Sequence, residues 1–232
     1  MSSQTAPPPG RQRRATRATR ARILRAARRE LGRNPDSSLG DIAEAAGVAR
    51  RTLYTHFAGR AALVEGLAEE AAEAVRLAIA ATSTSGPGPV SSSGPGPASA
   101  LARFVLTLWP VGDCYRTLID LAGRDLGPGQ VREVLAPARE TVAGILAEGQ
   151  RQGVFHAAVP PGPLSGAIEA HLLTLLAAVN SGIWADDGTG AATAALIAAG
   201  VDGDTAAATV RRLHGAERLP SPDRTHRPHR PH

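Results

Sequence analysis

The chain has 232 residues, 43% hydrophobic and only 3% aromatic, so it is long enough for a packed core that must consist mainly of aliphatic side chains. All 26 basic residues are arginines, and residues 1–60 carry a net charge of +9 whereas residues 61–214 carry −6, as in a chain that meets a polyanion with one end. The single Cys114 excludes an intrachain disulfide framework. No run of about 18 apolar residues predicts a membrane span, and no apolar segment of signal-peptide type follows the basic N-terminus, so we expect a cytoplasmic protein with no membrane partner.

Alanine and leucine dominate the apolar positions and β-branched residues do not alternate along the chain, so the sequence predicts an all-α fold. Residues 1–14 contain a proline run and are expected to form a disordered basic arm. The Gly-, Pro- and Ser-rich segment 82–98 is expected to be a flexible linker, and residues 215–232 a disordered tail. The expected helices cover residues 12–31, 38–46, 49–58, 60–81, 98–109, 112–125, 129–152, 162–184 and 189–213, the last interrupted at the sequence GVDGD.

The segment GVARRTLYTHF, which runs from Gly47 to Phe57, combines a glycine turn with a short amphipathic helix. At about 100° per residue, Leu53 and Phe57 share the inner face, and Arg51 and Thr55 lie opposite. A helix, a short turn containing glycine, and a second helix with a basic outer face form the layout of a helix-turn-helix. The segment therefore predicts a DNA-binding helix, although a solvated amphipathic surface helix is the alternative.

The residue types on this helix suit contact with duplex DNA. An arginine can form paired hydrogen bonds with guanine in the major groove, and a threonine methyl can pack on the thymine methyl. Tyrosine and histidine on the flanks can donate to phosphate oxygens. Ahead of the turn, Ser38 and Asp41 have the spacing of a capping box that starts the first of the two helices. The candidate DNA-binding residues are Ser38, Arg50, Arg51, Thr52, Tyr54, Thr55, His56 and Arg60.

The run RILRAARRELGRNPDSSLGDIAEAAGVARRTLYTHFAGRAALVEGLAEE resembles the N-terminal DNA-binding domain of the TetR family of transcriptional regulators. The matching pieces are IL.AA...L, DIAEAAGV, TLYTHF and ALVEGL. Arg60 stands where the family has an arginine or lysine shortly after the His-Phe pair. Two positions depart from the family pattern: Ala49 stands where the family usually has a serine or threonine that caps the recognition helix, and Leu31 stands where the first helix of the domain usually ends with an aromatic.

The resemblance implies a three-helix helix-turn-helix domain over residues 15–60 and a helical ligand-binding and dimerisation domain over residues 61–214. It also implies a homodimeric repressor that an unknown small-molecule effector releases from a palindromic, double-stranded DNA operator.

In the C-terminal part, an apolar stripe on the expected helix 162–184 suits half of a four-helix dimer interface. This stripe consists of Leu164, Ile168, Leu172, Leu175 and Val179. A pocket is expected at the break between helices 98–109 and 112–125. The alternative for Phe104 and Trp109 is that they belong to the core, and the alternative for His171 is that it belongs to the dimer interface. The candidate ligand-binding residues are Phe104, Trp109, Cys114, Tyr115, Arg116 and His171.

Two other functions stay open at this point. An enzyme is disfavoured because the sequence has no catalytic motif and no set of residues at metal-ligand spacing, and we expect no cofactor or metal. A non-specific DNA-coating protein would use only the arginine-rich arm and would bind any duplex equally well at a given salt concentration.

Overall fold

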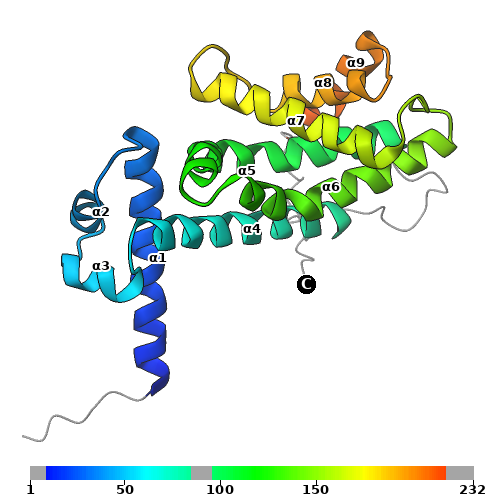
Figure 1. The fold of residues 1–232 in the computed structure, drawn as a ribbon. Coiled ribbons are helices and arrows are strands. Elements are labelled where there is room, and N and C mark those ends of the chain that lie inside the picture. The colour runs from blue at the N-terminus through cyan, green and yellow to red at the C-terminus, as the bar shows by residue number, and fades with distance from the viewer. Residues whose placement is uncertain (1–8, 85–95, 218–232) are drawn as a thin grey trace, which may run out of the picture.

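The computed structural model describes residues 9–84 and 96–217, and within these ranges the chain forms nine α-helices and no strand (Figure 1). The predicted all-α fold is confirmed. The helices are α1 (Pro9–Arg33), α2 (Leu39–Ala45), α3 (Arg50–His56), α4 (Arg60–Thr84), α5 (Pro97–Asp125), α6 (Pro128–Arg151), α7 (Pro161–Asn180), α8 (Thr189–Ala198) and α9 (Gly203–Glu217).

Helices α1, α2 and α3 form the N-terminal domain around a small aliphatic core. The predicted capping box starts α2, with Ser38 as the N-cap and Asp41 at the third helical position. Gly47 then turns the chain into α3 with a φ of 61°, a left-handed conformation that favours glycine. Leu31, at the position that departs from the family pattern, is 1% exposed and packs in this core. The core includes Ile23, Leu24, Ala27, Leu31, Ile42, Leu53, Phe57, Leu63 and Val64, and it extends onto α5 at Tyr115, Leu118 and Leu121.

Helix α4 leaves the N-terminal domain and becomes the first helix of the body, which comprises α4 to α9 (Figure 1). In the body, α4 packs against α5 and α6, α6 packs against α7, and α5 also contacts α8 and α9. The body core is separate from that of the N-terminal domain and includes Leu101, Leu146 and Leu196, each fully buried. This arrangement joins a small domain to a larger bundle through one continuous helix.

Several element boundaries differ from those expected. Helix α1 begins at Pro9, so residues 9–14 of the expected arm are helical, while residues 1–8 lie outside the described ranges. Helix α5 continues through Pro110, where we expected a break. A proline inside a helix costs about 3 kcal/mol, but the neighbouring Trp109 is buried, and packing on the surrounding helices offsets this cost.

The other boundaries are close to prediction. The expected interruption of the last helix is confirmed, because α8 ends at Ala198 and α9 begins at Gly203. Helix α4 reaches Thr84 and α9 reaches Glu217; the central part of the expected linker, residues 85–95, and the tail from 218 to 232 lie outside the described residues.

Helix α7 is the one helix in the described ranges that is long and apolar enough to cross a membrane by length and composition. Here it packs on α6 and α8, and only 22% of its apolar stretch is buried within the chain. The expected dimer stripe is partly wrong, because Leu164 and Ile168 are buried inside the protomer. The outer face of α7 instead carries mainly small side chains, namely Ala167, Ala170, His171, Thr174 and Ala177.

Candidate DNA-binding surface and ligand cavity

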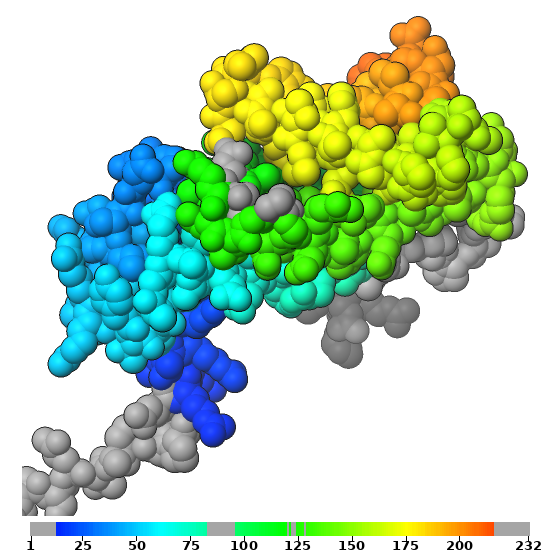
Figure 2. Space-filling view, in the orientation of Figure 1, coloured from blue at the N-terminus to red at the C-terminus, as the bar shows by residue number. Residues whose placement is uncertain are grey.

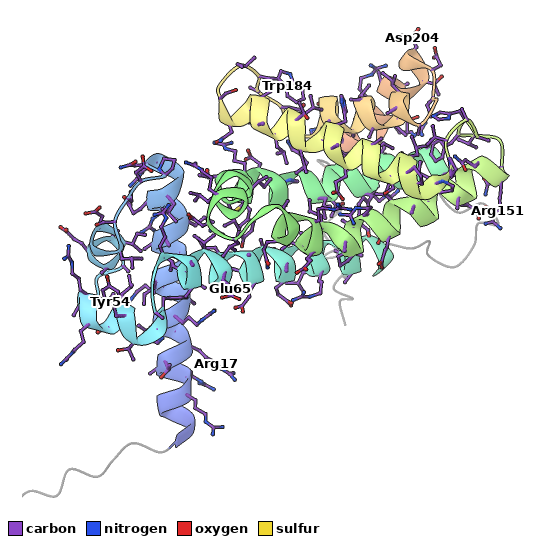
Figure 3. The ribbon with its side chains drawn as sticks, viewed as in Figure 1. Arg17, Tyr54, Glu65, Arg151, Trp184 and Asp204 are labelled. Carbon is purple, nitrogen blue, oxygen red and sulfur yellow. The ribbon has the colours of Figure 1, made fainter. Side chains whose placement is uncertain are left out.

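The predicted orientation of α3 is confirmed by burial. Leu53 is 0% exposed and Phe57 2%, whereas Tyr54 is 54% exposed. Arg51 and Thr55 are also exposed. Figure 3 labels Tyr54 on α3, at the edge of the N-terminal domain. The helix is therefore anchored by one apolar face and presents arginine, hydroxyl and phenol groups to solvent.

Two candidate residues near the turn are held against α2. The Ser38 hydroxyl donates to Asp41 Oδ2 at 2.8 Å and accepts from the Asp41 backbone nitrogen at 3.2 Å, so its main role is the cap. Hydrogen bonds from the Ser38 backbone and side chain, with a smaller effect of Arg50, hold the pKa of Asp41 below its usual value. The Arg50 guanidinium lies against Gly40, so a side chain at position 40 would have to displace it.

Arg60, which we expected to bind a phosphate, makes three bonds within the protein. Its Nε pairs with Asp125 at the end of α5 at 3.1 Å, and its two terminal nitrogens donate to the carbonyl oxygens of Pro35, at 2.6 Å, and Ser37, at 3.1 Å. All three guanidinium nitrogens are thus used inside the protein. Arg60 holds the α1–α2 connection and the body together at the start of α4.

The remaining candidates on α3 are half-buried or use part of their bonding capacity. Thr52 and His56 are half-buried, and the His56 ring lies 6.5 Å from that of Phe57. The Thr55 hydroxyl donates to the Arg51 carbonyl oxygen at 2.9 Å, which leaves its oxygen lone pairs and its methyl group for a base. Ala49 makes no side-chain cap bond, as its substitution for serine or threonine predicts.

Helix α1 adds a basic surface beyond α3. Its N-terminal half projects past the other helices of the domain, and Figure 3 shows Arg17 on this projection. Arg13, Arg14 and Arg17 are exposed. Further along, Arg20 pairs with Glu69 at 2.9 Å and lies 5.2 Å above the Phe57 ring, so it fixes α1 on α3 and α4.

A cavity of about 140 Å³ lies in the body between α4, α5, α6 and α7. Its wall is mostly aliphatic and includes Val75, Val142, Leu172 and Leu176. It lies among the body helices that Figure 2 shows packed together next to the N-terminal domain. Such an apolar cavity suits a small molecule.

Only two of the six candidate ligand-binding residues, Trp109 and Tyr115, line this cavity. Phe104 is buried in the core, and His171 is exposed on α7. Cys114 is exposed, and Arg116 pairs with Asp113 at 2.5 Å. The expected pocket depended on a helix break that α5 does not have, and α5 contributes to the cavity wall as one continuous helix beside α4, α6 and α7.

Tyr115 contacts both the cavity and the N-terminal domain. Arg28 of α1 donates to its hydroxyl oxygen at 3.3 Å, and the Arg28 guanidinium lies 5.3 Å from the ring centroid. Burial raises the pKa of the Tyr115 phenol, and the Glu70 carboxylate raises it further. The phenol is therefore neutral at physiological pH.

The N-terminal part of the chain matches a known protein family. Residues 23–67 match the sequence model of the bacterial regulatory proteins of the tetR family. No curated protein matches the sequence.

Among the described residues, no group of three or more His, Cys, Asp or Glu side chains could hold a metal ion.

Solved structures of several regulators share the fold. RolR, determined in complex with resorcinol, is 21% identical with a TM-score of 0.55, covering 86% of this chain and 96% of its own. The TetR-like regulator LfrR from Mycobacterium smegmatis, in complex with proflavine, is 23% identical with a TM-score of 0.58; the match covers 78% of this chain and 94% of LfrR. The TetR-family regulator PfmR from Thermus thermophilus is 20% identical with a TM-score of 0.58; the match covers 78% of this chain and 95% of PfmR. The fold is that of TetR-family transcriptional regulators, with the family's DNA-binding domain at the N-terminus.

Proposed function

We propose that this TetR-family transcriptional regulator is a cytoplasmic homodimer that represses its target by binding a palindromic operator, and that a small molecule in the body cavity releases it. The observation that carries the proposal is the exposed, basic outer face of α3 in a domain whose sequence matches the family.

The DNA contacts follow from the chemistry of the exposed groups. Arg51 has no ion pair among the described residues, so its guanidinium can donate twice to a guanine in the major groove. The Tyr54 hydroxyl and the exposed arginines of α1 can donate to phosphates, which fix the position of the helix without specifying sequence. We retain Thr52, Thr55, His56 and Arg50 as secondary contacts, and drop Arg60.

The body cavity supports the effector part of the proposal. RolR and LfrR, which share the fold, were determined with resorcinol and proflavine bound, so small organic molecules bind regulators of this architecture. In this chain, the same helix α5 provides Trp109 to the cavity and Asp125 to the Arg60 contact with the N-terminal domain. An occupant of the cavity therefore has a direct route to the orientation of α3.

The outer face of α7 supports the homodimer. Its small side chains allow two helices to approach closely, and a two-fold axis would place the two N-terminal domains symmetrically. If a ligand favours a body conformation in which these domains are wrongly spaced, it must weaken operator binding by the factor by which the operator weakens ligand binding.

The direct test compares affinity for a selected operator with affinity for a scrambled duplex of equal length and composition at one salt concentration. We expect the operator to bind at least about 10³-fold more tightly. Equal affinity for the two duplexes would support a non-specific DNA-coating protein instead.

A further inference from the structure

The charged groups at the cavity wall are paired with one another. Arg139 Nε donates to Glu169 Oε2 at 2.9 Å, and Arg139 Nη2 donates to Glu169 Oε1 at 3.0 Å. The same Nη2 also donates to the Arg132 carbonyl oxygen at 3.1 Å. The Ser165 hydroxyl donates to the Arg139 carbonyl oxygen at 2.8 Å. This end of the cavity therefore has neither an unpaired charge nor an unused hydroxyl donor.

The other two polar residues of the described wall are uncharged. Tyr115 directs its hydroxyl to Arg28 of α1, so it offers the cavity mainly its ring. Gln130, near the start of α6, is neutral at every pH. All other wall residues are aliphatic, glycine, or Trp109.

A charged ligand would be costly in such a site. Because Arg139 and Glu169 already neutralise each other, an anion or a cation would have to share one of these two charges with its present partner or stay unpaired. An uncharged apolar ligand has neither cost and gains from removal of its surface from water.

The volume sets the size of the group that the cavity can enclose. A dry cavity of about 150 Å³ lined by aliphatic and aromatic side chains accommodates benzene in another protein. The cavity here has a comparable volume of about 140 Å³. Gly112 of α5 and Leu176 of α7 both line it and lie close together, because an added β-carbon on Gly112 would lie 2.9 Å from Leu176.

We propose that the effector is an uncharged, largely apolar molecule of about one aromatic ring with one or two further atoms. The inference rests on the proposed function in taking this cavity as the effector site, and it adds the chemical class of the ligand.

Three probes of nearly equal shape separate charge from size: toluene, benzyl alcohol and benzoate. Trp109 lines the cavity, so its fluorescence reports occupancy in a Trp184→Phe background that removes the neighbouring indole 6.2 Å away. At pH 7.5 we expect toluene and benzyl alcohol to saturate the signal, and benzoate to bind about a hundredfold more weakly or not at all. Equal or tighter binding of benzoate, or no binding of any probe, would overturn the inference.

A matched pair of variants locates the binding. Ala138→Leu places three extra carbons in the cavity, whereas Ala136→Leu makes the same change on α6 outside its wall. We expect Ala138→Leu to lower toluene affinity by at least about tenfold and Ala136→Leu to keep it, with both variants showing a cooperative thermal transition. Equal toluene affinity of the two folded variants would place the ligand elsewhere and refute the proposal.

Operator binding is measured separately in the same samples. If toluene binds but operator affinity is unchanged, the ligand class stands and the release mechanism of the proposed function is wrong. If benzoate binds and releases the operator while toluene does not, the release mechanism stands and the ligand class is wrong.

Discussion

On α3 and its flanks, the partners of each guanidinium decide its role. Arg60 has Asp125 and two carbonyl oxygens as partners, so it is structural. Arg50 lies against α2, beside the capping box. Arg51 is exposed on the outer face. We therefore assign direct base contact to Arg51 ahead of the other arginines.

Replacement of Arg51 by Ala should weaken binding to the preferred operator by roughly 1–3 kcal/mol and relax preference at one base pair in each half-site. Replacement of Tyr54 by Phe removes one hydroxyl and should weaken binding about equally on all sequences, because a phosphate contact carries no base information. The measurement is the affinity of both variants across all single-base operator variants.

The opposite pattern would refute this assignment. If Tyr54→Phe changes base preference while Arg51→Ala only lowers affinity, the roles of the two side chains are exchanged.

At the scale of the helix, α1 has two functions along its length. Its C-terminal half belongs to the core through Ile23 and Leu31, whereas its N-terminal half projects with exposed arginines. We expect this projecting half to contact phosphates that flank the bases contacted by α3.

Replacement of Arg13, Arg14 and Arg17 by Gln should reduce the slope of log affinity against log salt by about 0.9 for each phosphate that the protein no longer binds, without a change in the preferred core sequence. Arg151→Gln, at the far end of the body, removes one arginine charge outside the DNA-binding surface and serves as the control (Figure 3). An unchanged slope in the triple variant would mean that α1 does not touch DNA.

Helix α5 connects the cavity to α1 through Tyr115. Tyr115→Phe keeps the ring that lines the cavity and removes the oxygen that accepts from Arg28. We expect toluene to bind the variant with similar affinity, while the coupling free energy between toluene and operator falls by about 1 kcal/mol. The measurement is the ratio of operator affinities with and without saturating toluene, and an unchanged ratio would exclude Tyr115 from the route.

Local sequence signals predicted the N-terminal domain and not the cavity. The Ser38 cap, the Gly47 turn and the spacing of Leu53 and Phe57 lie within a short segment, so they specify its geometry without the rest of the chain. The cavity wall consists mostly of aliphatic residues from four helices, and nothing in sequence distinguishes them from filled core. Pro110 predicted a break because local propensity ignores the tertiary packing that holds α5 continuous.

At the scale of the whole molecule, a basic domain and an acidic body are joined by α4 and by the Arg60–Asp125 pair. The half-exposed apolar helix α7 lies on the body, away from the N-terminal domain (Figure 1). A second copy on α7 would bury this face and leave both α3 helices free for DNA.

Ala170→Arg should therefore shift the protein toward monomer, because a long charged side chain cannot be accommodated between closely packed helices. Ala158→Arg, in the exposed connection between α6 and α7, is the matched control. Sedimentation equilibrium of both variants measures the effect; a dimer of unchanged affinity in Ala170→Arg would place the interface elsewhere.

A symmetric pair of α3 helices is proposed to bind a specific DNA sequence, and selection of bound duplexes from a random pool measures this specificity. We expect enrichment of a palindrome whose half-site centres are about 34–36 Å apart, one DNA turn, or a multiple of it. A pool that stays random after repeated selection, while total DNA binding remains strong, would contradict it.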